Sequence, residues 1–246
     1  MYHTAAFSRV VHAKKSRDAL MQAGGVLKSF VQLFFPETCA GCRERLREDE
    51  LYICGECHNS LTILTPGERL AEYNGRYKSE KLIDEIYPLF GMMRDSIEIE
   101  IIHRIKYRNK QKLAHWLGQL HAKMITDYCD YDFVSPVPLH KLKLLERGYN
   151  QSELIARGIS AESNIPFKNC LKKTVYTETQ THKSAFERRK NIRNTFEPVQ
   201  GADITGKWVL LADDVLTTGA TVSECAKVLK ENGAAKVAVA TIALTI

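Results

Sequence analysis

Unbroken apolar runs near the carboxyl terminus predict strands that are buried on both faces of a parallel sheet. One run lies within residues 207–215 and the other spans 236–244. Such runs are typical of parallel strands that helices cover on both sides. Between them, residues 220–232 have the spacing of an amphipathic helix, and Gly233 follows where a glycine often ends a helix. This part of the chain therefore predicts a right-handed β-α-β unit.

The upstream pattern predicts further helices and shorter strands. Helices are expected at 18–35, from about 96 to a break near 109, over 112–128 and around 154–159, and strands at 86–91 and 133–138. Pro88 places the first of these strands at a sheet edge, because proline donates no ladder hydrogen bond. Residues 66–84 are polar and are expected to form a connector. His115 and His121 stand six residues apart, so they form no helical metal pair, and both are expected at the surface.

Two carboxylates, Asp213 and Asp214, follow the apolar run of the strand at 207–215. A small polar turn separates them from the next helix, and its residues are Thr217, Thr218, Gly219, Ala220 and Thr221. Backbone N–H groups at a helix start bind phosphate, and a glycine lets the main chain approach closely. The aspartates can accept hydrogen bonds from sugar hydroxyls or help hold a divalent cation. We therefore expect a phosphate–sugar site at this strand end.

Other acidic strand ends fit less well. A Walker-type nucleotide site needs a G-x-x-x-x-G-K-[ST] loop, and a dinucleotide site needs G-x-G-x-x-G, and the chain contains neither motif. A capped helix beside two incidental surface aspartates is the remaining structural alternative.

Four of the seven cysteines form two C-x2-C pairs, and these are Cys39, Cys42, Cys54 and Cys57. Four thiolates at this spacing suit tetrahedral coordination of one structural Zn²⁺, with no open position left for chemistry. A redox C-x-x-C, an iron–sulfur site and two disulfides are the alternatives, and disulfides are disfavoured without a secretory context. The acidic residues between the pairs are expected in a solvated hairpin, and these are Glu44, Glu48, Asp49 and Glu50. The remaining cysteines, Cys129, Cys170 and Cys225, are expected as small core residues.

Basic residues are unevenly spread over a chain of 246 residues with a net charge of +6. Every charged residue in 104–112 is basic, and 168–193 holds eight Lys or Arg against two Glu. Such surfaces suit a pyrophosphate or a nucleic-acid backbone, with solvated helix faces as the alternative. Residues 1–17 are also basic, and form either a flexible tail or a transit-like or nucleic-acid-contacting arm.

The hydrophobic content of 44% with 26% charged residues is that of an ordinary globular chain. No apolar run reaches the roughly 18 residues needed to span a bilayer. The apolar stretch 26–35 is short, contains Lys28 and lacks a cleavage site for a signal peptidase. We therefore expect a cytoplasmic protein without a transmembrane segment.

Two basic segments add to the expected site. Residues 139–151 form a basic loop after the strand at 133–138 and open onto a helix, a setting that can hold a second anionic group. Residues 171–196 are long, polar and basic, and form either a lid over the site or a disordered connector. The first segment and the acidic pair should lie at the same edge of the sheet.

The segment 209–221 resembles the phosphoribosyl-pyrophosphate (PRPP) motif of type I phosphoribosyltransferases. That motif has four apolar residues, an acidic pair, two apolar residues and a threonine–glycine–threonine loop, and Ala212 is the one soft departure from it. Together with other motifs, it makes the chain from about Phe34 onward resemble the ComF family of competence-associated, phosphoribosyltransferase-like proteins. Those motifs are the four cysteines after a Phe-Pro segment, Ile105-Lys106-Tyr107, Val137-Pro138-Leu139-His140, Arg147-Gly148-Tyr149-Asn150-Gln151, Thr179-Gln180 and Arg188-Arg189-Lys190-Asn191. Residues 1–30 lie outside the resemblance.

The resemblance implies roles for particular residues. Asp213 and Asp214 would meet the ribose hydroxyls, and residues 217–221 the 5-phosphate. Segment 137–147 would be the pyrophosphate loop, with Arg147 as its charge partner, and segment 172–193 the hood loop that closes over the ligand. The catalytic candidates are Arg147, Arg188 and Arg189, the last two neutralising pyrophosphate together with Mg²⁺.

The fold class implied is α/β, a type I phosphoribosyltransferase-like parallel sheet flanked by helices, with a small N-terminal zinc-ribbon module. The expected organisation is a basic tail and amphipathic helix (1–36), a four-cysteine module (37–65), a connector (66–84) and the phosphoribosyltransferase-like domain (85–246).

Two function classes remain open. One is DNA uptake for natural transformation, in which the domain handles incoming single-stranded DNA beside helicase-type uptake proteins and retains a PRPP site. The other is an active phosphoribosyltransferase that uses PRPP and an acceptor that the sequence does not identify. Fold resemblance alone does not decide between them.

Overall fold

The structure is a computed structural model that describes residues 37–107, 110–127, 130–176, 192 and 194–246. Its centre is a parallel sheet with the strand order β1-β6-β5-β2. The strands are β1 (Glu85–Met92), β2 (Phe133–Pro136), β5 (Trp208–Leu216) and β6 (Lys236–Thr245), while β3 (Leu171–Lys173) and β4 (Phe196–Pro198) form a separate antiparallel pair. The helices are α3 (Gly55–Ser60), α4 (Pro66–Arg76), α5 (Ile97–Tyr107), α6 (Gln111–Met124), α7 (Lys141–Arg147), α8 (Gln151–Ser163) and α10 (Ala220–Glu231). The predicted α/β class is confirmed.

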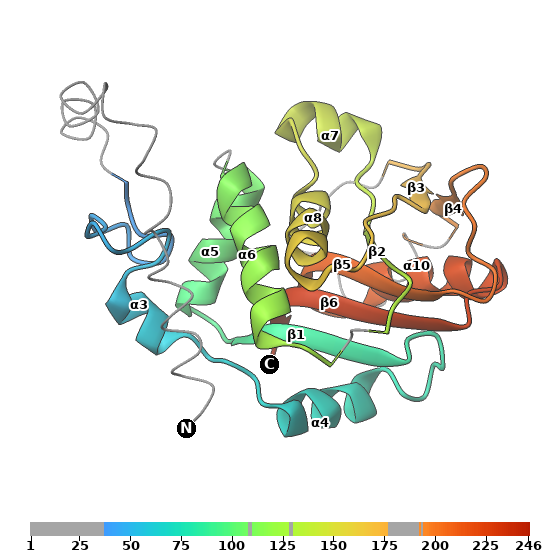
Figure 1. The fold of residues 1–246 in the computed structure, drawn as a ribbon, viewed down its shortest axis with the longest axis horizontal. Helices are drawn as coiled ribbons and strands as arrows, with labels where there is room; N and C mark the ends of the chain where they lie inside the picture. Colours follow the sequence, from blue (N-terminus) through green and yellow to red (C-terminus); the bar gives the residue numbers. More distant parts are fainter. Residues whose placement is uncertain (1–36, 108–109, 128–129, 177–191, 193) are drawn as a thin grey trace.

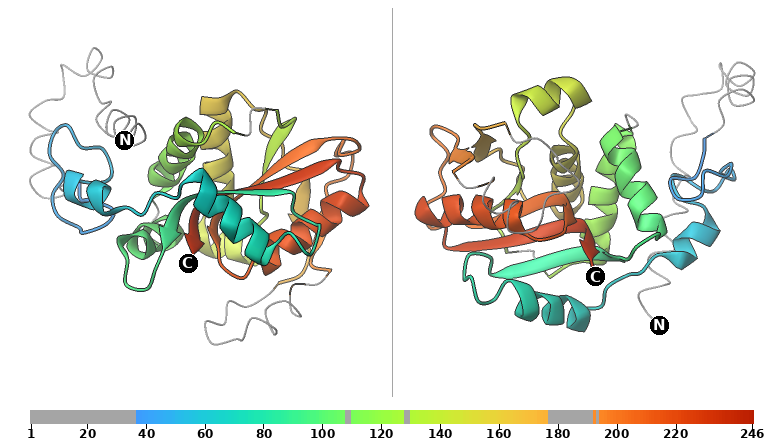
Figure 2. Two further views of the ribbon diagram at one scale, coloured as in Figure 1. Left: turned by 90° about the horizontal axis from the view of Figure 1, so that it is seen from below. Right: turned by 180° about the vertical axis from the view of Figure 1, so that it is seen from behind.

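Helices cover both faces of the sheet (Figure 1). Helices α5, α6 and α8 pack on one face, and α10 and α4 lie on the other (Figure 2). Along β5, Leu210 and Ala212 belong to the core beneath α6 and α8, whereas Val209 and Leu211 belong to the core beneath α10. Alternate side chains of a strand point to opposite faces, so an unbroken apolar run indicates a strand covered on both sides.

Strand β1 lies at one edge of the sheet, as Pro88 predicts. Its outer side is not bare. The backbone N–H of Gly91 donates to the carbonyl of Thr62 at 2.8 Å, and that of Leu64 donates to the carbonyl of Leu89 at 3.2 Å. The segment between α3 and α4 therefore covers the edge and ties the cysteine module to the sheet.

Residues 66–76, within the expected connector, form helix α4. The side chain of Thr65 accepts from the Glu68 N–H at 3.3 Å, and the Glu68 carboxylate accepts from the Thr65 N–H at 2.8 Å. This capping box satisfies two N–H groups at the helix start. The Thr-x-x-Glu spacing carries this signal in the sequence, and the polar composition of the segment conceals it.

Helices α6 and α8 cross at a point where both carry glycine. A Cβ on Gly118 would lie 2.1 Å from the carbonyl oxygen of Ile155, and a Cβ on Gly158 would lie 2.1 Å from that of His115. The backbones therefore approach more closely than any other residue pair would permit. This contact brings α8, and with it Ser152, over the end of β5.

The expected surface position of His121 is wrong. His121 is fully buried, and its Nε2 lies 2.6 Å from the carbonyl oxygen of Tyr87. Burial lowers the pKa of His121 to about 4, so the ring is neutral in the core. His115 is half-buried. Cys170 and Cys225 are buried as predicted, while Cys129 and the helix expected at 18–35 lie outside the described residues.

Candidate functional site

The acidic pair lies near the carboxyl end of β5. Both side chains are nearly buried, with Asp213 9% and Asp214 4% exposed. Oδ1 of Asp213 accepts hydrogen bonds from Ser152 Oγ at 2.7 Å and from the Asp214 N–H at 2.9 Å. Lys106 Nζ lies 3.0 Å from Oδ2 of Asp214, so the ammonium group forms an ion pair with this buried oxygen.

Burial and the neighbouring carboxylate change the protonation of Asp213. Burial first, and the charge of Asp214 second, raise the pKa of Asp213 to about 7, against the opposing effects of Ser152, the Asp214 N–H and Lys106. Burial lowers the pKa of Lys106, but the charges of Asp214 and Asp213 outweigh burial, so its pKa is raised. When ionised, the two carboxylates exceed the single positive charge beside them. The site therefore favours a further cation or hydroxyl donors.

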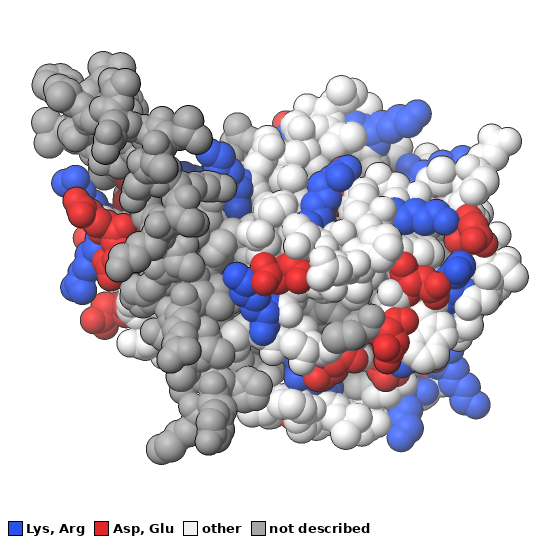
Figure 3. Space-filling model, in the orientation of Figure 1, with Lys and Arg blue, Asp and Glu red and all other residues white. Residues whose placement is uncertain are grey.

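Further cations lie around Lys106. The pKa of Lys143 is lowered by burial and, to a smaller extent, by the charge of Arg147. The pKa of Lys173 is lowered by burial and, to a smaller extent, by the charge of Lys143. The charge of Arg147 also acts on Lys106. Figure 3 shows separate Lys and Arg side chains in the region of α7 and β3, with acidic side chains lower in the same view. Cations that repel one another in this way favour a bound anion.

Only Arg147 among these cations is a site residue expected from the sequence. Lys106 belongs to the Ile-Lys-Tyr motif, and Lys143 and Lys173 belong to the two basic segments. Their roles depend on which face of α5, α7 or β3 points toward β5, which no local pattern specifies.

The small polar turn leads directly into α10. Gly219 is the N-cap, with φ 75°, and no side chain caps this helix. The first N–H groups of a helix have no partner inside it, so an uncapped start favours an anion. Thr217 is exposed, Thr218 and Thr221 are half-buried, and Ala220 is buried.

Tyr77 packs against this turn. A Cβ on Gly219 would lie 2.4 Å from Cε1 of Tyr77, so the ring fills the space that any side chain at this position would need. Tyr77 is 3% exposed, and its hydroxyl has no hydrogen-bond partner among the described residues. Glycine is thus required here both by the backbone conformation and by the ring.

The segment expected as a basic loop, 139–151, contains the helix α7. The His140 side chain accepts from the Leu142 N–H at 3.2 Å at its start, and Gly148 ends it with φ 80°. No residue of α7 is buried, so its leucines, Leu142, Leu144 and Leu145, are exposed and do not pack on the sheet. Arg147 is its last residue, and Nη1 donates to Gln151 Oε1 at 2.5 Å, at the start of α8.

The other two catalytic candidates, Arg188 and Arg189, lie outside the described residues, as does most of the expected hood loop. The described ends of that segment are β3 and β4, which pair with Leu171 opposite Pro198 and Lys173 opposite Phe196. Lys173 is the last residue of β3, and it lies near enough to Asp213 for that carboxylate to act on its charge.

The four paired cysteines converge as predicted. Their Sγ atoms all lie within 4.8 Å of one another, and could hold a metal ion. The N–H groups of Cys54 and Gly41 donate to Cys39 Sγ at 3.2 and 3.4 Å. Burial raises the pKa of Cys39, but N–H donation by Cys54, Cys42 and Gly41 lowers it to about 7, whereas burial raises the pKa of Cys54 and Cys57, so Cys39 is the thiol that most readily becomes a thiolate.

Glu50 does not belong to a solvated hairpin as expected. It is 5% exposed, and its carboxylate accepts the N–H groups of Arg47 and Gly55, each at 2.8 Å. It therefore braces the turn between the two cysteine pairs.

Comparisons with known proteins show to which family this chain belongs. A model of the phosphoribosyl transferase domain family matches residues 77–245. Competence protein F of Haemophilus influenzae is 30% identical over 210 residues, which cover 82% of this chain and 87% of that protein. Competence protein ComFC of Bacillus subtilis is 26% identical over 204 residues, 81% of this chain and 80% of that protein.

The DNA utilization protein YhgH of Escherichia coli is 35% identical over 149 residues, 56% of this chain. The match covers 63% of that protein, so the chain spans less than two thirds of its length. Among the described residues, no helix is long and apolar enough to cross a membrane.

Proposed function

This chain belongs to the phosphoribosyl transferase domain family and to the ComF family within it, and on that premise we propose that it binds PRPP, or a closely related phosphorylated sugar, in the cleft around Asp213 and Asp214. The observation that carries the proposal is the contact of the buried Asp214 with Lys106 directly before the uncapped start of α10. A ligand with hydroxyls between two phosphate groups fits an acidic pair flanked by anion sites on either side.

Each part of the cleft has a proposed role. The carboxylates of Asp213 and Asp214 accept hydrogen bonds from the ribose hydroxyls. The N–H and hydroxyl groups of 217–221 bind the 5-phosphate. Arg147 binds the pyrophosphate, and Lys106, Lys143 and Lys173 add positive charge around it. Arg188 and Arg189 join them from the hood segment.

Mg²⁺ suits this donor set, because the two buried carboxylates supply hard oxygens, and when ionised they carry more negative charge than Lys106 offsets. Asp214 and Asp213 would help hold the ion together with the ligand's own oxygens. When bound, Mg²⁺ supplies positive charge that offsets the charge of the pyrophosphate.

We propose that the cellular role is DNA uptake or utilization, with incoming single-stranded DNA as a partner and helicase-type uptake proteins beside it in the cytoplasm. The names of the related proteins, competence protein F, ComFC and DNA utilization protein, support this role. The basic run 104–112 and the basic segment 168–193 supply charge for a nucleic-acid backbone.

The four cysteines are proposed to hold one structural Zn²⁺. All four donors are sulfur and three of them are buried, so a closed tetrahedral site fits better than a catalytic one.

The alternative is an active transferase. A nucleophilic acceptor would form a bond to C1 of the ribose while the bond from C1 to the pyrophosphate oxygen breaks. The cations around Arg147 favour this alternative, because they lie where charge on the departing pyrophosphate would be stabilised. The acceptor is not identified by any described residue.

Isothermal titration of the full chain with PRPP, with and without Mg²⁺, tests the proposal. We expect Mg²⁺-dependent heat with wild type and a loss of affinity of at least about tenfold in Asp214→Asn, which keeps the volume and removes the charge. Asp203→Asn, an exposed aspartate elsewhere, is the matched control and should bind as wild type does.

If Asp214→Asn binds PRPP as tightly as wild type does, PRPP binds elsewhere on the chain. If wild type does not bind PRPP, the proposed PRPP site is refuted. Release of pyrophosphate from PRPP with candidate acceptors distinguishes the transferase from a binding protein.

A further inference from the structure

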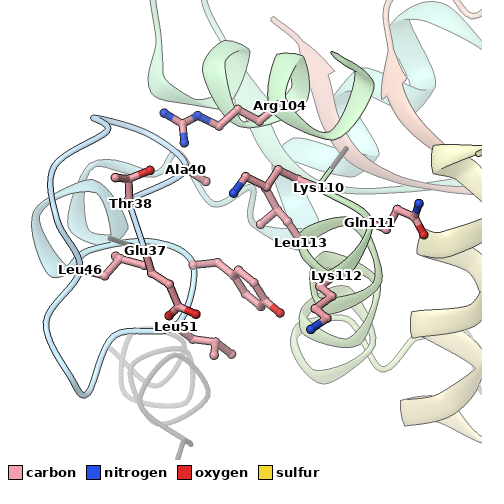
Figure 4. A pocket seen from close by; sticks show the side chains of 11 residues that line it. Glu37, Thr38, Ala40, Leu46, Leu51, Arg104, Lys110, Gln111, Lys112 and Leu113 are labelled. Carbon is pink, nitrogen blue, oxygen red and sulfur yellow. The ribbon is translucent and has the colours of Figure 1, made fainter. Parts of the chain in front are cut away.

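A second pocket lies between the cysteine module and the junction of α5 with α6 (Figure 4). Its volume is about 430 Å³. Glu37, Thr38 and Tyr52 line it from the module, and Arg104, Lys110 and Lys112 line it from the helices. None of these residues belongs to the PRPP cleft proposed above.

The charge of this pocket is positive. Arg104 is paired with Glu100, so Lys110 and Lys112 supply the positive charge that the single lining acid, Glu37, does not balance. Lys110 and Lys112 are exposed and form no ion pair with the described residues. Arg104 is 3% exposed, and its Nε donates to Glu100 Oε1 at 3.1 Å, which holds the guanidinium in place. Figure 4 shows the Arg104 side chain extending from α5 toward the cysteine module. An anion is therefore the fitting occupant.

The pocket also has an aromatic wall. Tyr52 is half-buried, and its ring lies 5.3 Å from that of Trp116, centre to centre, at 54°. Trp116 is buried and contacts the tyrosine ring, while Leu113 adds an apolar surface to the pocket. A fixed aromatic ring beside cations is the combination by which proteins hold single-stranded nucleic acids, with the base stacked and the phosphates near Lys and Arg.

We propose that this pocket holds one nucleotide of a single-stranded nucleic acid, with its base against Tyr52 and its phosphates near Lys110 and Lys112. The inference rests on the proposed role in handling single-stranded DNA, and it gives that role a place of its own. Residues 1–36 are a poorer occupant, because they carry five basic residues against Asp18 alone and so share the charge of the pocket.

Helix α5 separates the pocket from the PRPP cleft. Arg104 and Lys106 stand two residues apart, so their side chains point roughly 200° apart around the helix. Arg104 lines the pocket, while Lys106 contacts Asp214. Both ligands should therefore bind to one chain at the same time.

Fluorescence anisotropy with a labelled oligothymidylate, on the full chain, tests the proposal. Lys110→Gln/Lys112→Gln should weaken binding at least about tenfold, and should lower the slope of log Kd against log salt by about 1.4, for two lost phosphate contacts. Lys207→Gln/Lys227→Gln removes the same charge at half-buried, ion-paired positions away from the pocket and should change the affinity little. Tyr52→Leu should weaken binding about 5- to 100-fold, through the loss of one stacked base.

Two further measurements locate the DNA. In a Trp208→Phe background, Trp116 is the remaining tryptophan, and its emission should be quenched with the Kd measured by anisotropy. Saturating PRPP with Mg²⁺ should leave the DNA affinity unchanged, because the two sites lie on opposite faces of α5.

The outcomes separate this inference from the proposed function. Three outcomes would overturn the pocket but leave a DNA-binding role. In the first, Lys110→Gln/Lys112→Gln leaves oligothymidylate binding unchanged. In the others, the control variant weakens binding equally, or PRPP displaces the oligothymidylate. Absence of oligothymidylate binding by wild type would refute both the pocket and the DNA role, and PRPP titration would still test the cleft.

Discussion

Replacement of Gly219 by alanine tests the close packing of the phosphate-binding turn. Gly219 has φ 75°, and a Cβ would lie 2.4 Å from Cε1 and 3.0 Å from the hydroxyl oxygen of Tyr77. The substitution therefore has two separable costs, one from the backbone conformation and one from the collision with the ring.

The backbone cost can be estimated separately from the collision. An L-residue in the left-handed region costs roughly 1–2 kcal/mol. Overpacking of a filled space costs about 1–3 kcal/mol more. Gly201 has the same φ of 75° and open space within 4 Å of its Cβ position, so Gly201→Ala carries the backbone cost alone.

Urea denaturation should give a free energy of unfolding for Gly219→Ala that is about 1–3 kcal/mol lower than that of Gly201→Ala. In thermal denaturation the difference corresponds to about 2–4 °C for each kcal/mol in a chain of this length. Gly219→Ala should also weaken PRPP binding, because the turn or the ring must move, whereas Gly201→Ala should not.

A double-mutant cycle isolates the collision. In a Tyr77→Leu background the ring is absent, so the penalty of Gly219→Ala should fall to that of Gly201→Ala. An equal penalty of Gly219→Ala in both backgrounds would show that Tyr77 does not restrict this position.

Four other predictions concern charge, metal and packing. Asp213→Asn should become more stable relative to wild type as pH rises from 3.8 to about 7, by about 1.4 kcal/mol per unit of pKa shift. The pKa of Asp213 is raised in the folded protein, so the stability that the protonated carboxyl gives to wild type is present at low pH and is lost over that window. A stability difference in urea denaturation that does not change with pH would contradict this prediction. Lys106→Met should cost about 3–5 kcal/mol by leaving Asp214 buried without its partner, and added Asp214→Asn should recover most of it; no recovery would argue against the pair. Purified protein should contain one zinc per chain by elemental analysis, lost in Cys39→Ser and kept in Cys170→Ala; equal metal in both variants would refute the site. Gly158→Ala should destabilise by about 1–3 kcal/mol or more in urea, because its Cβ would meet a backbone oxygen at 2.1 Å, whereas Gly67→Ala near the start of α4 meets open space and should be near neutral.

Several features follow from the sequence by itself. The apolar run before Asp213 predicts a strand covered on both faces, because both of its alternating faces are apolar. The C-x2-C spacing predicts the cluster of four sulfurs, because each pair occupies a single tight turn. Strand, acidic pair and helix start are also consecutive in the chain, so local rules suffice to predict the turn that leads into α10.

Only the tertiary structure decides which residues from distant elements meet at that turn. Lys106 reaches Asp214, and Tyr77 covers Gly219, across more than a hundred residues of chain. His121 is buried because α6 packs on the sheet with that face inward, and no pattern of its neighbours distinguishes it from His115. Helix α7 buries none of its residues, so the leucines that it carries at helical spacing do not become part of a core. Periodicity and spacing describe each element alone, whereas the charge, protonation and shape of the cleft arise where helices pack against the end of β5.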